Sequence, residues 1–420
     1  MSTIINVECF HEGFFEDAEL VLMITIIVWV INVKMLRENQ QFPPPHDFGV
    51  YWKNSCNFKL EDTMKLFTVG PTQMRKEIME VGGQLVPYFR TPEFSEIMLD
   101  SDRLLKKFMN AGRDAQSIYL TCSGTGAMEA TIMNCFTKND KVLIVDGGTF
   151  GHRFVDLCKV HGIPHDSICI RFDEILTEKH FKKYDNKGYT AVFVNIDETS
   201  TGQLYDIKII SDYCKRNDTY LVVDAISSFL IDHYDMDTYD VDATIISSQK
   251  GMCIAPGLSV VVLSDRIVRE RVKKIDIKNL YFNFNEYMKD FERGQTPFTP
   301  CVGICMEMNR ALNLIEEMGL ENLLMSIDKV AKDFRKRVKE LPVTIPAFPL
   351  SSAITPIIFK DKIAKKVFNI LKDKYDVYVN PTGGDREEYV LRVAHIGDTT
   401  IEDNKMLIDL LRKAIKEAKS

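Results

Sequence analysis

The chain has 420 residues, of which 45% are hydrophobic and 27% charged, and its formal net charge is −7. This length allows two domains with large cores, and the composition is that of an ordinary soluble protein. The acidic balance argues against a nucleic-acid partner, because such binding needs a clustered field of basic side chains.

The ten cysteines are scattered from Cys9 to Cys305, and no two of them form a CxxC pair. Metal sites and disulfide frameworks show tighter and more regular spacing. We therefore expect reduced thiols, no metal site and a cytoplasmic location.

The first 63 residues differ from the rest of the chain. An uncharged apolar run extends from Leu20 to Val33, and the prolines of "QQFPPPHDFG" follow it. The run is shorter than the roughly 20 residues that span a bilayer as a helix. A packed element or a partner-binding segment is therefore favoured over a membrane anchor. We assign residues 1–63 to an appendage of unknown role.

From Met64 the pattern alternates between strands and helices. "MKLFTVGPTQ" predicts a short strand that ends at Gly70-Pro71. Apolar strands follow within 117–124, 141–148, 191–202, 219–228, 243–248 and 257–264, with helices within 125–136, 150–162 and 206–217 and charged helical segments up to about 330. Strands that are apolar throughout, separated by amphipathic helices, indicate an α/β fold with a mostly parallel sheet covered on both faces.

The end of the chain predicts a smaller α+β domain. Strands are expected within 353–360, 375–384 and 388–397, and helices within 361–374 and 401–418. We place a large domain at 64–325 and a small domain at 326–420.

Polar residues stand at several predicted strand ends, where open α/β sheets bind their ligands. Ser123, Gly124 and Thr125 lie between a strand and a helix, so free amides and the helix dipole could hold a phosphate. A plain chain reversal is the competing interpretation. Asp224 ends the strand in "LVVDAISS" and could keep a heterocyclic nitrogen protonated, or simply cap a helix.

Lys250 follows the apolar strand "ATIISS". Such a lysine can serve as a Schiff-base amine, although taken alone it could extend its amine to solvent. Phe150 offers a flat face for a pyridine ring, and Thr199 a hydroxyl, but both could be structural. Arg392, inside the apolar strand "YVLRVAHIG", suits a substrate carboxylate or an internal salt bridge.

Taken in order, these residues resemble the class V aminotransferases, which are fold-type I pyridoxal-phosphate enzymes. The alanine/serine:glyoxylate and 2-aminoethylphosphonate:pyruvate branches are the most similar. The resemblance covers roughly residues 64 to 418 and rests on "CSGTGAMEA", "DETSTG", "VVDAISS", "SSQKGMCIAPG" and "LRVAHIG". Residues 1–63 match nothing in that family.

The resemblance implies pyridoxal 5'-phosphate as the cofactor and a role for each matching residue. Lys250 is the catalytic lysine that carries the cofactor, and Arg392 binds the substrate carboxylate while Gly70 lines the substrate. The implied cofactor-binding residues are Ser123, Gly124, Thr125 and Gln249 at the phosphate, Phe150 and Ile226 on the two ring faces, Asp224 at the ring nitrogen and Thr199 at the ring hydroxyl. Thr296 resembles a residue that reaches the phosphate of the neighbouring subunit, which implies a homodimer with shared active sites.

The expected reaction moves an amino group from alanine, serine or 2-aminoethylphosphonate to glyoxylate or pyruvate. A lyase of the cysteine desulfurase or kynureninase type is the alternative on the same scaffold. A desulfurase needs a nucleophilic cysteine, for which Cys301 and Cys305 are the nearest candidates, and usually has His where this chain has Gln249. A third possibility is a scaffold without activity, in which the first 63 residues mediate an interaction or membrane tethering.

Overall fold

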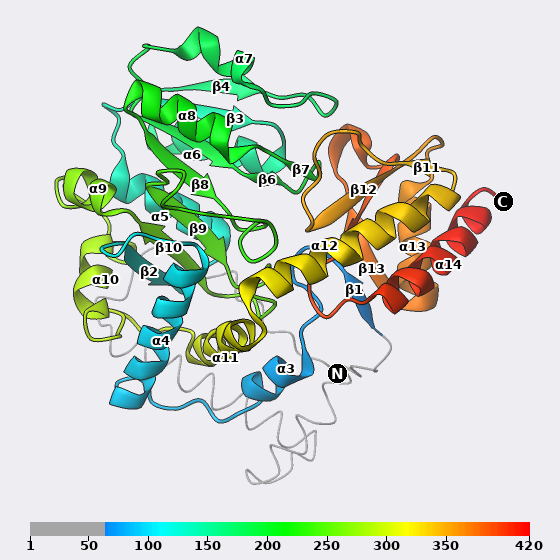
Figure 1. The fold of residues 1–420 in the computed structure, drawn as a ribbon, viewed down its shortest axis with the longest axis horizontal. Coiled ribbons are helices and arrows are strands. Elements are labelled where there is room, and N and C mark those ends of the chain that lie inside the picture. The colour runs from blue at the N-terminus through cyan, green and yellow to red at the C-terminus, as the bar shows by residue number, and fades with distance from the viewer. Residues whose placement is uncertain (1–63) are drawn as a thin grey trace, which may run out of the picture. The chain divides into compact units, whose positions relative to one another are not determined.

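The computed structural model describes residues 64–420, which Figure 1 draws in colour. The apolar run 20–33 and the rest of the predicted appendage lie outside the described residues. Within residues 64–420, no helix has the length and apolarity needed to cross a membrane.

A seven-stranded sheet forms the centre of the larger part of the structure. Its strands, in spatial order, are β2 (Gln116–Leu120), β10 (Ser259–Leu263), β9 (Ala243–Ser247), β8 (Tyr220–Asp224), β5 (Ala191–Asn195), β3 (Val142–Asp146) and β4 (His165–Cys169). Only β10 runs against its two neighbours, and the remaining pairs are parallel. The predicted α/β fold with a mostly parallel sheet is therefore confirmed.

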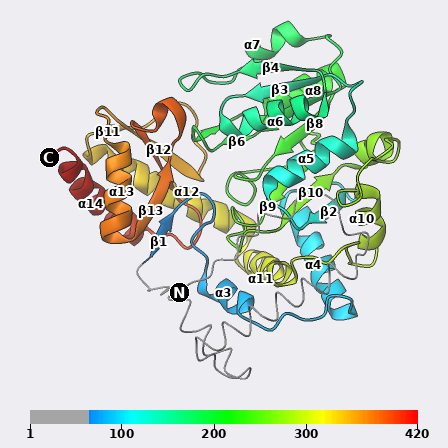
Figure 2. The same cartoon turned by 180° about the vertical axis from the view of Figure 1, so that it is seen from behind.

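Helices cover both faces of this sheet, as Figures 1 and 2 show from opposite sides. One face packs against α4 (Pro92–Phe108), α8 (Ile207–Asn217) and α11 (Val302–Met318), and the other against α5 (Gly124–Cys135), α6 (Thr149–His161) and α10 (Phe284–Phe291). Neighbouring residues of β3 show the alternation, because Leu143 and Val145 enter the first core while Val142 and Ile144 enter the second. Burial on both faces explains why the strands are apolar throughout.

A second sheet lies in the smaller part of the structure. Its order is β1 (Lys65–Phe67), β13 (Val377–Pro381), β14 (Val390–Ala394), β12 (Ile354–Phe359) and β11 (Val343–Thr344). A third hydrophobic core joins this sheet to α13 (Ala364–Tyr375) and α14 (Ile401–Ala418). β1 pairs with β13, so the strand that begins the described chain belongs to the sheet of the last hundred residues.

Helix α12 (Leu320–Arg337) joins the two parts. Its first half contributes Leu323 and Ile327 to the core of the large sheet, and Phe334 near its end packs into the core of the small sheet. The helix crosses between the two sheets in Figure 1. The domain boundary that we predicted after residue 325 falls inside this helix.

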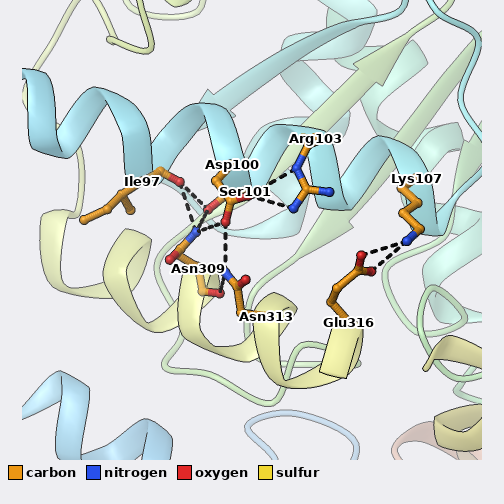
Figure 3. Close-up of polar contacts among 8 residues, drawn as sticks. All are labelled: Ile97, Asp100, Ser101, Arg103, Lys107, Asn309, Asn313 and Glu316. Atoms are coloured by element: carbon orange, nitrogen blue, oxygen red, sulfur yellow. Dashed lines mark hydrogen bonds and ion pairs between the residues drawn. The ribbon is translucent and has the colours of Figure 1, made fainter. Parts of the chain in front are cut away.

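A polar network holds α4 against α11 (Figure 3). Asn309 and Asn313 of α11 each donate to Asp100 Oδ2 of α4 at 2.9 Å, and Arg103 pairs with Asp100 Oδ1 at 2.8 Å. One turn further, Lys107 and Glu316 form an ion pair at 2.8 Å. These contacts fix the helix layer beneath the sheet.

Shorter elements complete the chain: α3 (Lys76–Gly82), α7 (Glu178–Phe181), α9 (Asp265–Ile267), β6 (Asp197–Glu198), β7 (Gln203–Leu204), and the single turns η2 (Lys182–Tyr184), η3 (Val268–Val272), η4 (Val338–Glu340) and η5 (Gly384–Arg386). The hairpin of β6 and β7 replaces the end of the single strand that we predicted over 191–202.

Candidate active site

The candidate residues lie where strands of the large sheet end. β2 leads to Ser123, β3 to Phe150, β5 to Thr199 and β9 to Lys250, while Asp224 is the last residue of β8. These five strands run in the same direction, so their carboxyl ends meet along one edge of the sheet.

The Lys250 side chain is half-buried at the centre of this edge. Its Nζ lies 5.9 Å from the centre of the Phe150 ring, and it forms no hydrogen bond or ion pair with any residue in 64–420. Burial lowers the pKa of Lys250 to about 8, against the opposing attraction of Asp197 and Asp224. An amine with this pKa is neutral in an appreciable fraction near neutral pH, as a nucleophile or base must be.

Gly70 lies against the same lysine. A Cβ placed on Gly70 would lie 2.7 Å from Lys250 Cε and 2.9 Å from Nζ. The segment before α3 and the loop after β9 therefore meet here. Any residue larger than glycine at position 70 would displace the lysine side chain.

Asp224 is 2% exposed, and its Oδ1 accepts a hydrogen bond of 2.9 Å from the amide of Ile226. Burial raises the pKa of Asp224 to about 6, with Glu198 raising it further and Lys250 lowering it. Ile226 packs over Gly124 at the start of α5, because a Cβ on that glycine would collide with its Cδ1. The acid, the isoleucine and the glycine turn are therefore neighbours.

The first turn of α5 presents amides that no side chain of its N-cap satisfies. Ser123 is the N-cap and makes no capping hydrogen bond, and the neighbouring Thr125 hydroxyl accepts from Arg153 Nη1 at 3.0 Å. Gln249 accepts from the Ser247 hydroxyl at 2.8 Å, which leaves its amide hydrogens available. Amides, the helix dipole and an arginine together suit a phosphate.

Thr199 and Arg392 meet between the two parts of the structure. Arg392 Nη1 donates to the Thr199 carbonyl at 2.6 Å, and Nη2 donates to the Pro381 carbonyl at 2.7 Å. The Thr199 hydroxyl has no hydrogen bond to any described residue. The internal salt bridge weighed for Arg392 is absent within residues 64–420, and its Nε is buried without a partner.

Thr296 stands apart from this cluster. Its hydroxyl donates to the Phe298 carbonyl at 2.7 Å, and its own carbonyl accepts from Arg90 at 2.8 Å. Neither of these hydrogen bonds involves a residue named around Lys250.

Three residues that sequence reasoning did not single out face the same site. Glu198 accepts hydrogen bonds from the amide of Gly151 at 2.8 Å and from the Ser200 hydroxyl at 2.6 Å, and so fixes the start of α6. Asp197 is 1% exposed, and neither of its carboxylate oxygens has a hydrogen-bond partner among the described residues. The guanidinium of Arg153 lies 5.0 Å from the centre of the Phe150 ring.

The sequence held a signal for each of these three. Asp197 and Glu198 belong to "DETSTG", and Arg153 lies one helical turn after Phe150.

The cysteines considered for lyase chemistry lie at the start of α11. Cys301 is half-buried and its amide donates to the Thr121 hydroxyl at 3.1 Å, while Cys305 is fully buried. A hydrogen bond from Cys305 lowers the pKa of the Cys301 thiol, and burial together with that bond raises the pKa of Cys305. Both cysteines are fixed by the helix rather than carried on a free loop.

The residues around Lys250 fit pyridoxal phosphate. The uncapped amides of α5 suit its phosphate, and the buried Asp224 suits a protonated ring nitrogen. The hydroxyl of Thr199 is unused, and Phe150 lies beside an amine that has no partner. Each of these is a polar or aromatic group whose natural complement is present on that cofactor.

Comparison with known proteins identifies the family. The profile of the class-V aminotransferases matches residues 88–386, well over half of the chain. The chain therefore belongs to the class-V aminotransferase family and is an aminotransferase. This family depends on pyridoxal phosphate.

Individual relatives agree with this assignment. The chain is 29% identical to an uncharacterized aminotransferase of Methanocaldococcus jannaschii over 86% of this chain and 94% of that protein. It is 26% identical to the L-aspartate–glyoxylate aminotransferase of Paracoccus denitrificans, over 80% and 87% of the two chains. The crystal structure of an alanine–glyoxylate aminotransferase from Nostoc sp. has the same fold, with a TM-score of 0.79 at 23% identity, covering 84% of this chain and 95% of that one.

Proposed function

We propose that this protein uses pyridoxal phosphate to move an amino group from a small amino donor to glyoxylate or pyruvate, with Lys250 as the catalytic residue. One observation carries the proposal. The Lys250 amine forms no hydrogen bond or ion pair with a described residue, yet it lies 5.9 Å from the centre of the Phe150 ring, and the charges of Asp224 and Arg392 act on its pKa. Alanine, serine and 2-aminoethylphosphonate are the donors implied by the resemblance.

The cofactor supplies an electron-withdrawing ring that stabilises negative charge on the amino-bearing carbon of the substrate. The carboxylate of Asp224 holds the proton on the ring nitrogen, which keeps the ring electron-withdrawing. Because Asp224 is buried and bonded to the Ile226 amide, its orientation is set before a ligand binds.

Lys250 moves the proton. Its Nζ would hold the cofactor, and its free amine would accept a proton from the substrate Cα and return it during the transfer of the amino group. A pKa of about 8 suits both directions of this transfer near neutral pH.

Arg392 holds the carboxylate of the amino or keto acid. Its position is set by the carbonyls of Thr199, in the turn between β6 and β7, and of Pro381, at the end of β13, so substrate binding depends on how these two segments meet. Gly70 leaves room for the lysine, and the Phe150 ring lies with its centre 5.9 Å from the Lys250 Nζ.

A panel of amino donors with glyoxylate and pyruvate tests the proposal. The protein is loaded with pyridoxal phosphate, and the absorbance of the lysine-bound cofactor is followed as each donor is added. We expect the visible band to shift with donor and to return with a keto acid. Lys250→Ala should lack both the band and turnover, and a Lys250→Ala protein that still transfers amino groups would overturn the role of Lys250.

We also propose that the active unit is a homodimer in the cytoplasm. Leu85, Tyr88 and Leu280 are 93%, 69% and 76% exposed. Tyr281 stacks on Phe298, two residues after Thr296, so this apolar surface borders Thr296. A second copy would cover it and place Thr296 near a neighbouring site. Light scattering on the full chain should give twice the monomer mass, and Leu280→Asp should lower the measured mass towards that of the monomer.

The cytoplasmic location is supported by the eight free cysteines among the described residues.

A further inference from the structure

Arg386 ends the short turn η5, between β13 and β14. Its guanidinium carbon lies 4.4 Å from the centre of the Phe172 ring, which comes from the loop after β4 in the large sheet. Its Nη1 is buried and has no hydrogen-bond partner, and Arg386 forms no ion pair within residues 64–420. A guanidinium that lies over an aromatic ring uses none of its N–H hydrogens in a conventional hydrogen bond there, so they remain available to another group.

Arg392 is a second cation, close enough for the charge of Arg386 to act on it. The loop that carries Arg386 begins at Pro381, whose carbonyl binds Arg392 Nη2 at 2.7 Å. Burial lowers the pKa of Arg392 to about 10, and the positive charge of Arg386 contributes to this lowering. Each of the two arginines therefore has one buried nitrogen without a partner, Nη1 of Arg386 and Nε of Arg392.

No carboxylate among residues 64–420 forms an ion pair with either arginine. Glu198 attracts both arginines, but its two oxygens already accept four hydrogen bonds from Phe150, Gly151 and Ser200. Asp197 is buried, and burial with the nearby charge of Asp232 raises its pKa well above the usual value. Both arginines are partly buried, and each has one buried nitrogen that no described residue satisfies, so a ligand that supplies negative charge is favoured here.

We propose that Arg386 and Arg392 together form one anion site, and that the amino donor it selects carries two negative charges, as a dicarboxylic amino acid or an aminoalkyl phosphonate does. This inference rests on the proposed transamination and narrows its donor. With a dicarboxylic donor, Arg392 binds the carboxylate nearest the reacting carbon and Arg386 binds the second carboxylate. With an aminoalkyl phosphonate, the two arginines share the single phosphonate group. Alanine and serine, with one carboxylate, leave Arg386 unpaired.

The test compares donors of different charge on the cofactor-loaded full chain. The second-order rate constant of cofactor conversion is measured with L-aspartate, L-glutamate and 2-aminoethylphosphonate, and with L-alanine and L-serine. We expect at least one of the first three to react about 10-fold faster than the last two. Arg386→Gln should lower the rate constant of the fast, doubly charged donor by about 10- to 100-fold. It should change the rate constants of L-alanine and L-serine by less than about 3-fold, because a hydrogen bond to a charged group is lost only with the doubly charged donor.

Arg171→Gln is the matched control. Arg171 precedes Phe172 but its side chain is 77% exposed, so its loss should change none of the five rate constants. Dependence on Arg386 with aspartate or glutamate assigns a dicarboxylic donor, and dependence only with the phosphonate assigns that class. Faster reaction with alanine or serine, or an equal loss for both groups in Arg386→Gln, would overturn the inference.

A binding measurement separates this inference from the proposed reaction. Succinate and butyrate have no amine, so their binding by calorimetry does not depend on turnover. We expect the wild-type protein to bind succinate more tightly and Arg386→Gln to lose that difference. If no donor reacts, the proposed function is wrong. Equal binding of succinate and butyrate by the wild-type protein would contradict only the preference for a doubly charged donor.

Discussion

Gly70 and Lys250 are in direct contact, and the contact leaves no room for a side chain. A Cβ on Gly70 would lie 2.7, 2.8 and 2.9 Å from Cε, Cδ and Nζ of the lysine. The atoms that would have to move belong to the flexible end of Lys250 and not to the backbone. A glycine in the segment before α3 therefore sets where the Lys250 amine stands.

Gly70→Ala should impair activity without unfolding the protein. The added methyl displaces the Lys250 amine, and a misplacement of about 1 Å can cost about 100-fold in rate. We expect kcat to fall by about 10- to 100-fold and the melting temperature to change little, since a side chain can rotate away. Gly383→Ala is the control, because a Cβ there meets nothing within 4 Å. An unchanged kcat in Gly70→Ala would show that the added methyl group does not displace the Lys250 amine.

The rate at which the cofactor-free protein takes up pyridoxal phosphate should depend on pH through Lys250. Only the neutral amine attacks the aldehyde, and burial lowers the pKa of Lys250 to about 8. The rate should therefore rise about tenfold per pH unit below pH 8 and level off above it. Stopped-flow absorbance across pH 6 to about 10 measures this profile.

Two variants should move the midpoint of that profile in opposite directions. Asp224 raises the pKa of Lys250 and Arg392 lowers it. Asp224→Asn should therefore shift the midpoint to lower pH, and Arg392→Gln to higher pH. A midpoint that stays near the ordinary lysine pKa in all three proteins would mean that the amine is not buried as described.

The strands of the large sheet could be predicted because burial on both faces makes them apolar throughout. Edge strand β4 (His165–Cys169) was missed, since only Ile168 of its five residues is buried and its other side chains are polar or exposed. The sheet partner of β1 could not be read locally either. Phe67 belongs to the core of the small sheet because β1 pairs with a strand more than 300 residues later, and no local pattern encodes that pairing.

The sequence offered candidate site residues where one rule applied, that ligands bind at the carboxyl ends of strands. Arg153 and Arg386 escaped this rule because they lie on a helix and on a turn. Their relevance depends on tertiary contacts, with Thr125 in the first case and with Phe172 in the second. An exposed and a buried arginine look alike in a sequence.

Asp224→Asn should reduce activity while stabilising the cofactor-free protein. Removing the charge that holds the ring nitrogen protonated should cost about 100- to 1,000-fold in kcat. In the folded protein, burial raises the pKa of Asp224 from 3.8 to about 6, so its ionisation opposes folding as the pH rises through that interval. Above pH 6 this cost is about 3 kcal/mol at most, which the asparagine avoids.

Unfolding by urea at pH 5 and pH 8 measures the second effect. The gain in free energy of unfolding of Asp224→Asn over the wild type should be larger at pH 8. Asp146→Asn serves as the control, because that residue ends β3 on the same sheet but is only half-buried. A destabilised Asp224→Asn protein at pH 8 would contradict the proposed cost of burial.

Arg392→Lys should weaken substrate binding more than it changes the fold. The guanidinium uses Nη1 for the Thr199 carbonyl and Nη2 for the Pro381 carbonyl, and a single ammonium cannot span both while also meeting a carboxylate. We expect KM for the keto acid to rise about 10-fold or more, in line with the loss of a charge-assisted hydrogen bond. Arg271→Lys is the matched control, since Arg271 of η3 also donates to a backbone carbonyl, that of Cys135, but contacts none of the proposed site residues through its hydrogen bonds. An unchanged KM in Arg392→Lys, with kcat also preserved, would remove Arg392 from the substrate site and leave it a purely structural link between the two sheets.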